Sequence, residues 1–459
     1  MRIVGQTARR VLLAAGLMAA AVPGSAETLA DTLVAAYNNS NLLEQNRALL
    51  RATDEDVAVS VSALRPVINF ITSANYTGSQ MGRSVDELTG NLGLTADLLI
   101  YDFGRTQLGV QAARETVLAT REALVGLEQQ VLLTGVQAFF NVRSAVEFVA
   151  LGESNVRLLE EELRASQDRF SVGEVTRTDV ALSEARLAAA RADLAAARGD
   201  LDVAREAYKV ATGRFPGTLT GPTPMPRLAD TLAEARALAA RNHPSVKQAQ
   251  RQVTVAGLNK ARAAAATRGT LSAGARLSVN EEFDDSSSLS LSFSQPIYQG
   301  GRLSSLFRQA LAREEASRAA LLQAVRIVEN EVGRAWSNFE VGRIRISAAE
   351  QQIEAARIAF AGAREEATLG ARTTLDVLDS EQELLNAQAT RIAAVNAESI
   401  AAYTLLASMG LLTVEQLNLG IPTYDPEAYY NAVQNAPATS VQGERLDRVM
   451  RALGREPAN

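Results

Sequence analysis

Two stretches in each half of the chain alternate between apolar and small polar residues. They cover 68–76 and 91–100 in the first half, and 271–279 and 288–294 in the second. Alternation with a period of two predicts β-strands that have one apolar and one polar face. Strands of about ten residues with this pattern are typical of membrane-spanning barrels, and a half-buried hairpin in a soluble protein has the same alternation. The pattern alone leaves both interpretations open.

Four such strands are too few to close a barrel. Known membrane barrels start at about eight strands. An open sheet edge in lipid leaves backbone groups unpaired, at a cost of several kcal/mol each. If the strands cross a membrane, several copies of the chain must therefore share one barrel. The alternative is a secreted or periplasmic coiled-coil scaffold whose strands form small soluble hairpins.

Most of the remaining sequence has the composition of long helices. Proline is absent from 67–215 and from 297–421, and both intervals are rich in Ala, Leu, Glu, Arg and Gln, which are strong helix formers. Little interrupts a helix over 105–171 or over 302–368. About 67 residues at about 1.5 Å each predict a rod of roughly 100 Å. Such a rod must bury its apolar stripe against other helices.

Each helical region is interrupted by the same kind of sequence. "VGEVTRTDVALSEARLAAA" occupies 172–190, and "LGARTTLDVLDSEQELLNA" occupies 369–387. Gly173 and Gly370 suit the left-handed residue that ends a helix. We therefore expect a helical hairpin in each half, with a returning helix about half as long as the rod.

Threonines after each glycine suit the first cap of a returning helix. The candidates are Thr176 or Thr178 in the first hairpin and Thr373 or Thr374 in the second. A threonine hydroxyl at this position accepts a hydrogen bond from a free backbone N–H of the first turn. The returning helices are therefore expected to begin at these threonines.

A shift of 197 residues brings landmarks of the two halves together. It pairs Gly173 with Gly370 and Asp179 with Asp376, and the same offset holds over more than 100 residues. One constant offset over such a length indicates a tandem duplication in which each copy has a helix, two strands, a long helix and a returning helix. We divide the chain into a first repeat, a Pro- and Gly-rich linker, a second repeat and a C-terminal tail, at 27–213, 214–228, 229–418 and 419–459.

The N-terminal residues have the features of a secretory signal peptide. Three arginines precede a short apolar run over 11–22, and Gly24 and Ala26 supply small residues at the −3 and −1 positions. We expect 1–26 to be a signal peptide that is cleaved after Ala26. No run of 18 apolar residues occurs anywhere in the chain, so a membrane-spanning helix is not expected.

Composition narrows the chemistry. The chain has 459 residues with 47% hydrophobic residues, no cysteine, one histidine and a formal net charge of −6. Disulfides and thiolate chemistry are excluded, and imidazole metal clusters and histidine-based triads are disfavoured. The acidic balance disfavours nucleic acid as a partner. We expect no enzymatic activity, no catalytic residue, no metal site and no cofactor.

Three motifs together resemble those of one known family. They are "RFSVGEVTRTDV" at 169–180, "LSFSQPIYQGGR" at 291–302 and the stretch at 369–387. The chain resembles TolC-type outer-membrane efflux proteins over nearly its whole mature length. Because no cysteine is available to carry a lipid, it is more similar to the unlipidated branch.

The resemblance implies both a fold and a function. The fold is an α+β membrane protein: a homotrimer whose 12-stranded outer-membrane β-barrel, with four strands from each chain, continues into a long α-helical barrel with coiled-coil hairpins across the periplasm. The function is the exit duct of a tripartite efflux or type I secretion system, gated at its periplasmic end. The implied partners are outer-membrane lipid, a periplasmic adaptor (membrane fusion) protein and an inner-membrane transporter of the RND or ABC type.

The resemblance also assigns a gate network. Arg372 matches the family's gate arginine, whose partners match Thr178 and Asp179. The family's tyrosine in this network falls at Ala367, so this chain lacks one hydrogen-bond partner for Asp179.

Two further acids match those that surround the family's pore constriction. They are Asp376 and Asp379. Copies of both acids around a narrow opening would attract cations and repel anions. The alternative is that Asp179 and Asp376 are ordinary first-turn acids at a helix N-terminus, with Arg372 and Asp376 as a surface ion pair. Asp379 lies beyond the first turn, and its counterpart in the first repeat is Leu182.

Overall fold

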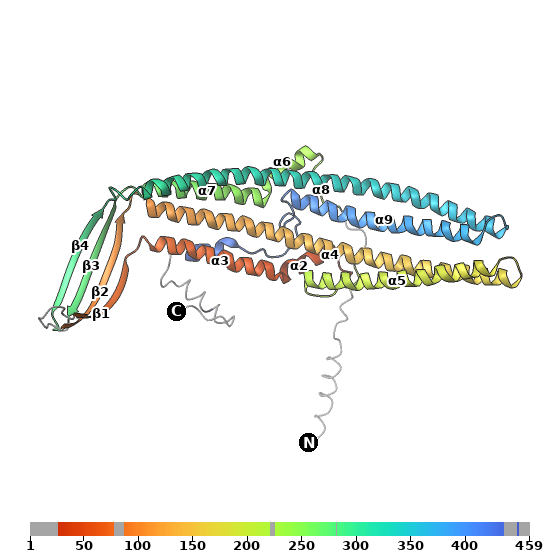
Figure 1. Cartoon of the computed structure of the whole chain (residues 1–459), viewed down its shortest axis with the longest axis horizontal. Coiled ribbons are helices and arrows are strands. Elements are labelled where there is room, and N and C mark those ends of the chain that lie inside the picture. Colours follow the sequence, from red (N-terminus) through yellow and green to blue (C-terminus); the bar gives the residue numbers. More distant parts are fainter. Residues whose placement is uncertain (1–25, 78–86, 221–224, 281, 436–447, 449–459) are drawn as a thin grey trace, which may run out of the picture. The chain divides into compact units, whose positions relative to one another are not determined.

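Long helices and four strands make up the part of the chain that the computed structural model describes (Figure 1). It describes residues 26–77, 87–220, 225–280, 282–435 and 448. The elements are α2 (Leu29–Asn39), α3 (Asn41–Ser62), β1 (Val67–Thr77), β2 (Glu87–Tyr101), α4 (Arg105–Ser171), α5 (Arg177–Thr212), α6 (Leu232–Asn242), α7 (Pro244–Ala265), β3 (Thr270–Asn280), β4 (Asp285–Ser294), α8 (Arg302–Thr368), α9 (Thr374–Ser408) and α10 (Pro426–Val433). Among the helices it describes, none is both long and apolar enough to cross a membrane.

The two halves of the chain have the same order of elements. In each half a helical segment precedes two strands, a long helix and a shorter returning helix. The long helices α4 and α8 both have 67 residues, and their bounds are those predicted from the sequence. They extend this far because their interiors contain no proline and consist largely of strong helix formers. The four predicted strands are also confirmed, each somewhat longer than its alternating core.

The chain divides into two compact units, and each takes segments from both halves. We call residues 1–40, 128–235 and 331–421 the hairpin unit, and residues 41–127, 236–330 and 422–459 the sheet unit. The helices α4 and α8 contribute residues to both units.

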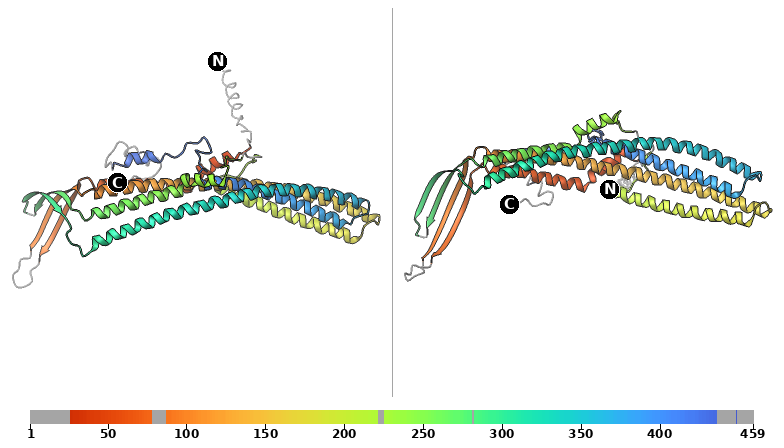
Figure 2. Two further views of the ribbon diagram at one scale, coloured as in Figure 1. Left: turned by 90° about the horizontal axis from the view of Figure 1, so that it is seen from above. Right: turned by 45° about the horizontal axis from the view of Figure 1, so that its top comes forward.

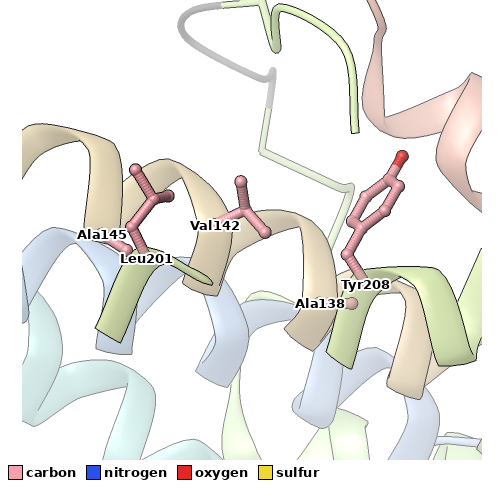
Figure 3. Close-up of a cluster of buried hydrophobic side chains, with 5 residues drawn as sticks. All are labelled: Ala138, Val142, Ala145, Leu201 and Tyr208. Carbon is pink, nitrogen blue, oxygen red and sulfur yellow. The ribbon is translucent and has the colours of Figure 1, made fainter. Parts of the chain in front are cut away.

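In the hairpin unit, the α4–α5 hairpin lies beside the α8–α9 hairpin (Figure 2). Ala138, Val142 and Ala145 of α4 pack against Leu201 and Tyr208 of α5 (Figure 3). Small side chains on α4 let the two helix backbones approach closely. Farther along α4, a second cluster includes side chains from α5 and α9, so the two hairpins share one core.

The N-terminal segment of the hairpin unit is tied to α5 and to the linker. The hydroxyl of Tyr208 donates to Glu27 Oε1 at 2.7 Å and lies 2.9 Å from Thr32 Oγ1 in α2. Arg214 donates to the same Glu27 oxygen at 2.6 Å. Glu27 also forms an isolated parallel bridge with Leu219. Helix α2 therefore begins at a fixed point on α5.

The sheet unit contains an antiparallel sheet of four strands in the order β1-β2-β3-β4. Its register separates the two kinds of side chain. One row across the sheet consists of Ile68, Ala96, Ala275 and Leu289, and the adjacent row of Asn69, Thr95, Arg276 and Ser288. Because neighbouring residues of a strand point to opposite faces, one face is apolar and the other polar. The large side chains of the apolar face are exposed, including those of Ile68, Phe70, Leu94, Leu289, Leu291 and Phe293.

The C-terminal segment of the sheet unit packs against α3 and α4. In α10, Tyr429 donates to Glu55 at 2.7 Å, and Arg121 of α4 lies over the Tyr430 ring, 5.2 Å from its centre. Asp54 is completely buried nearby, and neither of its carboxylate oxygens has a hydrogen-bond partner within the described ranges of the chain. Burial raises the pKa of Asp54 to about 6, although the charge of Arg121 opposes this shift. The described part of the tail, to which the sequence assigned no role, thus packs close to a buried acid.

Candidate functional site

The two hairpin turns have the same backbone geometry. Gly173 and Gly370 have φ angles of 82° and 75°, which residues with a Cβ atom rarely adopt. In each turn the glycine N–H donates to the carbonyl three residues earlier, and the next N–H donates to the carbonyl five residues earlier. These bonds satisfy the last free carbonyls of α4 and α8, so both long helices end cleanly at the turn.

Both returning helices begin with a reciprocal capping box. The Thr176 hydroxyl accepts from the Asp179 N–H at 3.3 Å, and the Asp179 carboxylate accepts from the Thr176 N–H at 2.8 Å. The corresponding distances for Thr373 and Asp376 are 3.2 and 3.0 Å. Of the two cap candidates in each hairpin, the structure therefore selects Thr176 and Thr373. Thr178 lies exposed in the first turn of α5.

The caps engage two of the predicted site acids. Hydrogen bonds from the hydroxyl and then the N–H of Thr373 lower the pKa of Asp376, and the charge of Arg372 adds to this effect. Asp376 is therefore ionised at neutral pH. Asp179 has the same geometry through Thr176, so both acids stabilise their own helix within a single chain.

Arg372 is bound to an acid of its own hairpin. Its Nε lies 2.8 Å from Glu366 Oε2 in the last turn of α8. Among the described residues, no hydrogen bond or ion pair joins Arg372 to Thr178 or Asp179. Within one chain, Arg372 thus lies at the second hairpin turn and Thr178 and Asp179 lie at the first, with no such bond between the two turns among the described residues.

Asp379 connects the two hairpins. Its Oδ1 lies 2.8 Å from a terminal nitrogen of Arg186 in α5. The two side chains are 59% and 39% exposed, so solvent screens the pair and it contributes at most about 1 kcal/mol. Arg186 has no role in the resemblance and was missed from the sequence.

A buried acid next to this pair was also missed. Glu381 of α9 is only 4% exposed, and neither of its carboxylate oxygens has a hydrogen-bond partner among the described residues. Burial raises its pKa to about 7, the charge of Glu162 adds to this rise, and Arg364 and Arg186 oppose it. The sequence did contain a signal, because an acid one turn after Leu378 falls on the apolar stripe of α9.

The described residues show no arrangement typical of metal binding. In the part of the chain that the structure describes, no group of three or more His, Asp or Glu side chains is placed to hold a metal ion.

The fold and the hairpins together define a class of protein. A four-stranded sheet with an exposed apolar face, joined to helices of 67 residues that end in capped hairpins, is the architecture of a membrane-embedded channel subunit. The chain belongs to the outer membrane efflux protein family, whose model matches residues 32–214 and 235–411.

Known proteins agree with this assignment. The chain is 33% identical over 416 residues to the outer membrane efflux protein BepC of Brucella suis, covering 89% of this chain and 91% of BepC. It is 25% identical over 391 residues to the outer membrane protein TolC of Escherichia coli K12, with 78% of each chain covered. The fold is similar to a crystal structure of CusC, with a TM-score of 0.77, 19% identity and coverage of 83% and 92%.

These findings confirm the resemblance seen in the motifs. The protein is an outer-membrane exit duct of the TolC type that extends into the periplasm. The coiled-coil scaffold, which the strand pattern left open, finds no support.

Proposed function

We propose that the protein works as a homotrimer whose sheets close one 12-stranded barrel. In the single chain, β1 pairs with β2 and β4 pairs with β3, so the outer edge of each has no partner strand among the described residues. An open edge in lipid is costly, and pairing β4 of one copy with β1 of the next removes it. The exposed apolar face of the sheet then contacts the lipid of the outer membrane.

The helices continue this barrel as a periplasmic tunnel. The repeated order of elements and the equal lengths of α4 and α8 support a tandem duplication, with the repeats at 27–213 and 229–418, the linker at 214–228 and the tail at 419–459. Each chain then contributes two similar segments to the tunnel wall. Identical copies of the chain then close the wall into a ring through repeated head-to-tail contacts.

The gate lies at the hairpin turns. In this proposal Arg372 releases Glu366 when the copies assemble in the closed state and binds Thr178 and Asp179 instead. The exposure of Arg372 and Thr178 supports this exchange. The cap uses Oδ2 of Asp179, so Oδ1 is available to accept from a guanidinium group. Ala367 leaves the network without the family's tyrosine.

The pore constriction is lined by Asp376 and Asp379. Asp376 is ionised at neutral pH and uses only Oδ2 for its cap, so Oδ1 can face passing ions. Rings of carboxylates in a narrow opening concentrate cations and exclude anions. The duct itself moves cargo without chemistry of its own.

A periplasmic adaptor and an inner-membrane transporter of the RND or ABC type open the gate. The end of each hairpin offers an exposed apolar side chain at the matching position, Val172 at 70% and Leu369 at 76% exposure. Single exposed apolar side chains are common on protein surfaces, so the support for this surface is that the same kind of side chain recurs at the end of both hairpins. The hairpin ends are therefore the surface at which the adaptor is expected to bind.

The observation that carries this proposal is the separation of apolar and polar rows across a sheet with two open edges. Single-channel recording in planar bilayers tests it. We expect cation-selective channels of low conductance, a higher conductance for Arg372→Ser, and weaker selectivity for the double variant Asp376→Ala, Asp379→Ala. Thr373→Ala is the control, because it weakens the same cap and keeps both acids.

Two results would refute parts of the proposal. Unchanged selectivity in the double variant would place the acids away from the pore. A monomer that is soluble without detergent would refute the trimeric duct, whereas a heat-modifiable trimer extracted by detergent supports it.

A further inference from the structure

Glu381 lies where the two helical hairpins meet. Leu378, one turn earlier in α9, belongs to a buried cluster with Leu159 of α4 and with Leu187 and Ala190 of α5. Glu381 is buried beside this cluster, and both of its carboxylate oxygens lack a hydrogen-bond partner in the part of the chain that the structure describes. An unpaired ionised carboxylate in such a place is costly, so the packed hairpins favour its neutral form.

The charges around Glu381 do not balance. Arg364 of α8 lies 3.1 Å from Glu162 of α4, and Arg186 of α5 lies 2.8 Å from Asp379 of α9. Both arginines facing Glu381 therefore already have an acidic partner. Ionised Glu381 is the excess negative charge in this group, and a proton is the simplest species that removes it.

We propose that Glu381 is a proton-binding site that makes the packing of the two hairpins depend on pH. With the proton bound, the α8–α9 hairpin packs on α4–α5 without an unpaired charge. When the proton leaves, the ionised carboxylate favours entry of water between the hairpins and their separation. The titratable and charged groups that take part are Glu162, Arg186, Arg364, Asp379 and Glu381.

The direction of the pH dependence follows from the linkage between proton binding and packing of the hairpins. Packing raises the pKa of Glu381 from 4.5 to about 7, so the packed hairpins bind the proton more tightly than separated hairpins do. The separated fraction therefore grows as the pH rises from about 4.5 to about 7, by at most about tenfold per pH unit for one proton. Below and above this window it is independent of Glu381.

This site also regulates the gate, an extension that rests on the proposed function. Asp379, which belongs to the proposed constriction, binds Arg186, whose charge acts on Glu381. Separation of the hairpins would break that ion pair and move a constriction acid. We expect the channel to open more often as the pH rises.

Hydrogen exchange followed by mass spectrometry tests the site in the full-length protein in detergent. After correction for the intrinsic pH dependence of exchange, protection of the α9 amides after Thr374 should fall about tenfold or more between pH 5.5 and 7.5. Glu381→Gln should abolish this dependence. Glu383→Gln is the matched control, because Glu383 is exposed, accepts from Gln352, and should leave the dependence intact.

A second variant covers the case in which Glu381→Gln does not fold. Glu162→Gln removes a neighbouring negative charge, so the midpoint of the wild-type transition should shift to lower pH. An unshifted midpoint, or a pH dependence that persists in Glu381→Gln, would overturn the proton site. Bilayer recording tests the link between the proton site and the gate separately. If hydrogen exchange depends on Glu381 and channel opening does not depend on pH, the proton site is retained and only its link to the gate is refuted.

Discussion

Removing the hydroxyl of Tyr208 should loosen the N-terminal segment from the hairpin unit. This hydroxyl is completely buried, donates to Glu27 and contacts Thr32. The variant Tyr208→Phe keeps the ring, which packs against Ala138 and Val142, and removes only the two hydrogen bonds.

The free energy lost in Tyr208→Phe depends on which hydrogen-bond partners Glu27 and Thr32 keep. Glu27 retains Arg214 and the N–H of Gly217, and the single proton of the Thr32 hydroxyl, no longer needed by Tyr208, can be donated to the carbonyl of Thr28. The loss is therefore one bond to a charged group, about 1.5 to 3 kcal/mol, and one neutral bond of about 0.5 to 1.5 kcal/mol, partly offset by relaxation. We expect a net loss of about 2 to 3 kcal/mol in the free energy that holds α2 on α5. This corresponds to a change of roughly 30- to 150-fold in the opening equilibrium.

Hydrogen exchange of the α2 amides measures this opening. In Tyr208→Phe, protection over Leu29–Asn39 should fall by that factor, while protection in α9 stays unchanged. Tyr403→Phe is the control, since Tyr403 is a buried tyrosine of the same unit with no side-chain hydrogen bond among the described residues. If Tyr208→Phe and Tyr403→Phe weaken α2 equally, or if Tyr208→Phe leaves it unchanged, the hydroxyl is not what anchors the segment.

Three further predictions concern stability. The pKa of Asp54 is raised from 3.8 to about 6. Its contribution to the free energy of unfolding is therefore fully present below about pH 3.8, and about 3 kcal/mol of it is lost as the pH rises to about 6. Asp54→Asn should remove this pH dependence, as measured by hydrogen exchange of the α3 amides. Thr176→Ala and Thr373→Ala should each lower the free energy of unfolding by about 1 kcal/mol, and each should fray only the first turn of its own returning helix. If one variant frays both helices, the two caps are not independent. Phe139→Ala should cost about 3 to 5 kcal/mol in thermal unfolding, and a loss below about 1 kcal/mol would mean that the core closes over the cavity.

Much of the local structure could be predicted from the sequence. Two features predicted both long helices with their observed bounds: their interiors lack proline, and glycines stand at 173 and 370. Each helix end could be predicted because it depends on the backbone preferences of a few neighbouring residues. Alternation predicted the four strands for the same reason. The three motifs identified the family, and the threonine candidates were narrowed to one per hairpin only by the cap geometry.

Contacts between distant residues could not be predicted in this way. Asp379 and Arg186 are 193 positions apart, and their pairing depends on which faces of α5 and α9 meet. The same packing buries Glu381, and the C-terminal segment packs on α3 at Glu55, next to the buried Asp54. Periodicity states which face of a helix is apolar, and it does not state which helix covers that face. Local conformation could therefore be predicted from the sequence. The surroundings of each charged group depend on how the elements pack together, so only the tertiary structure determines the pKa values of Glu381 and Asp54.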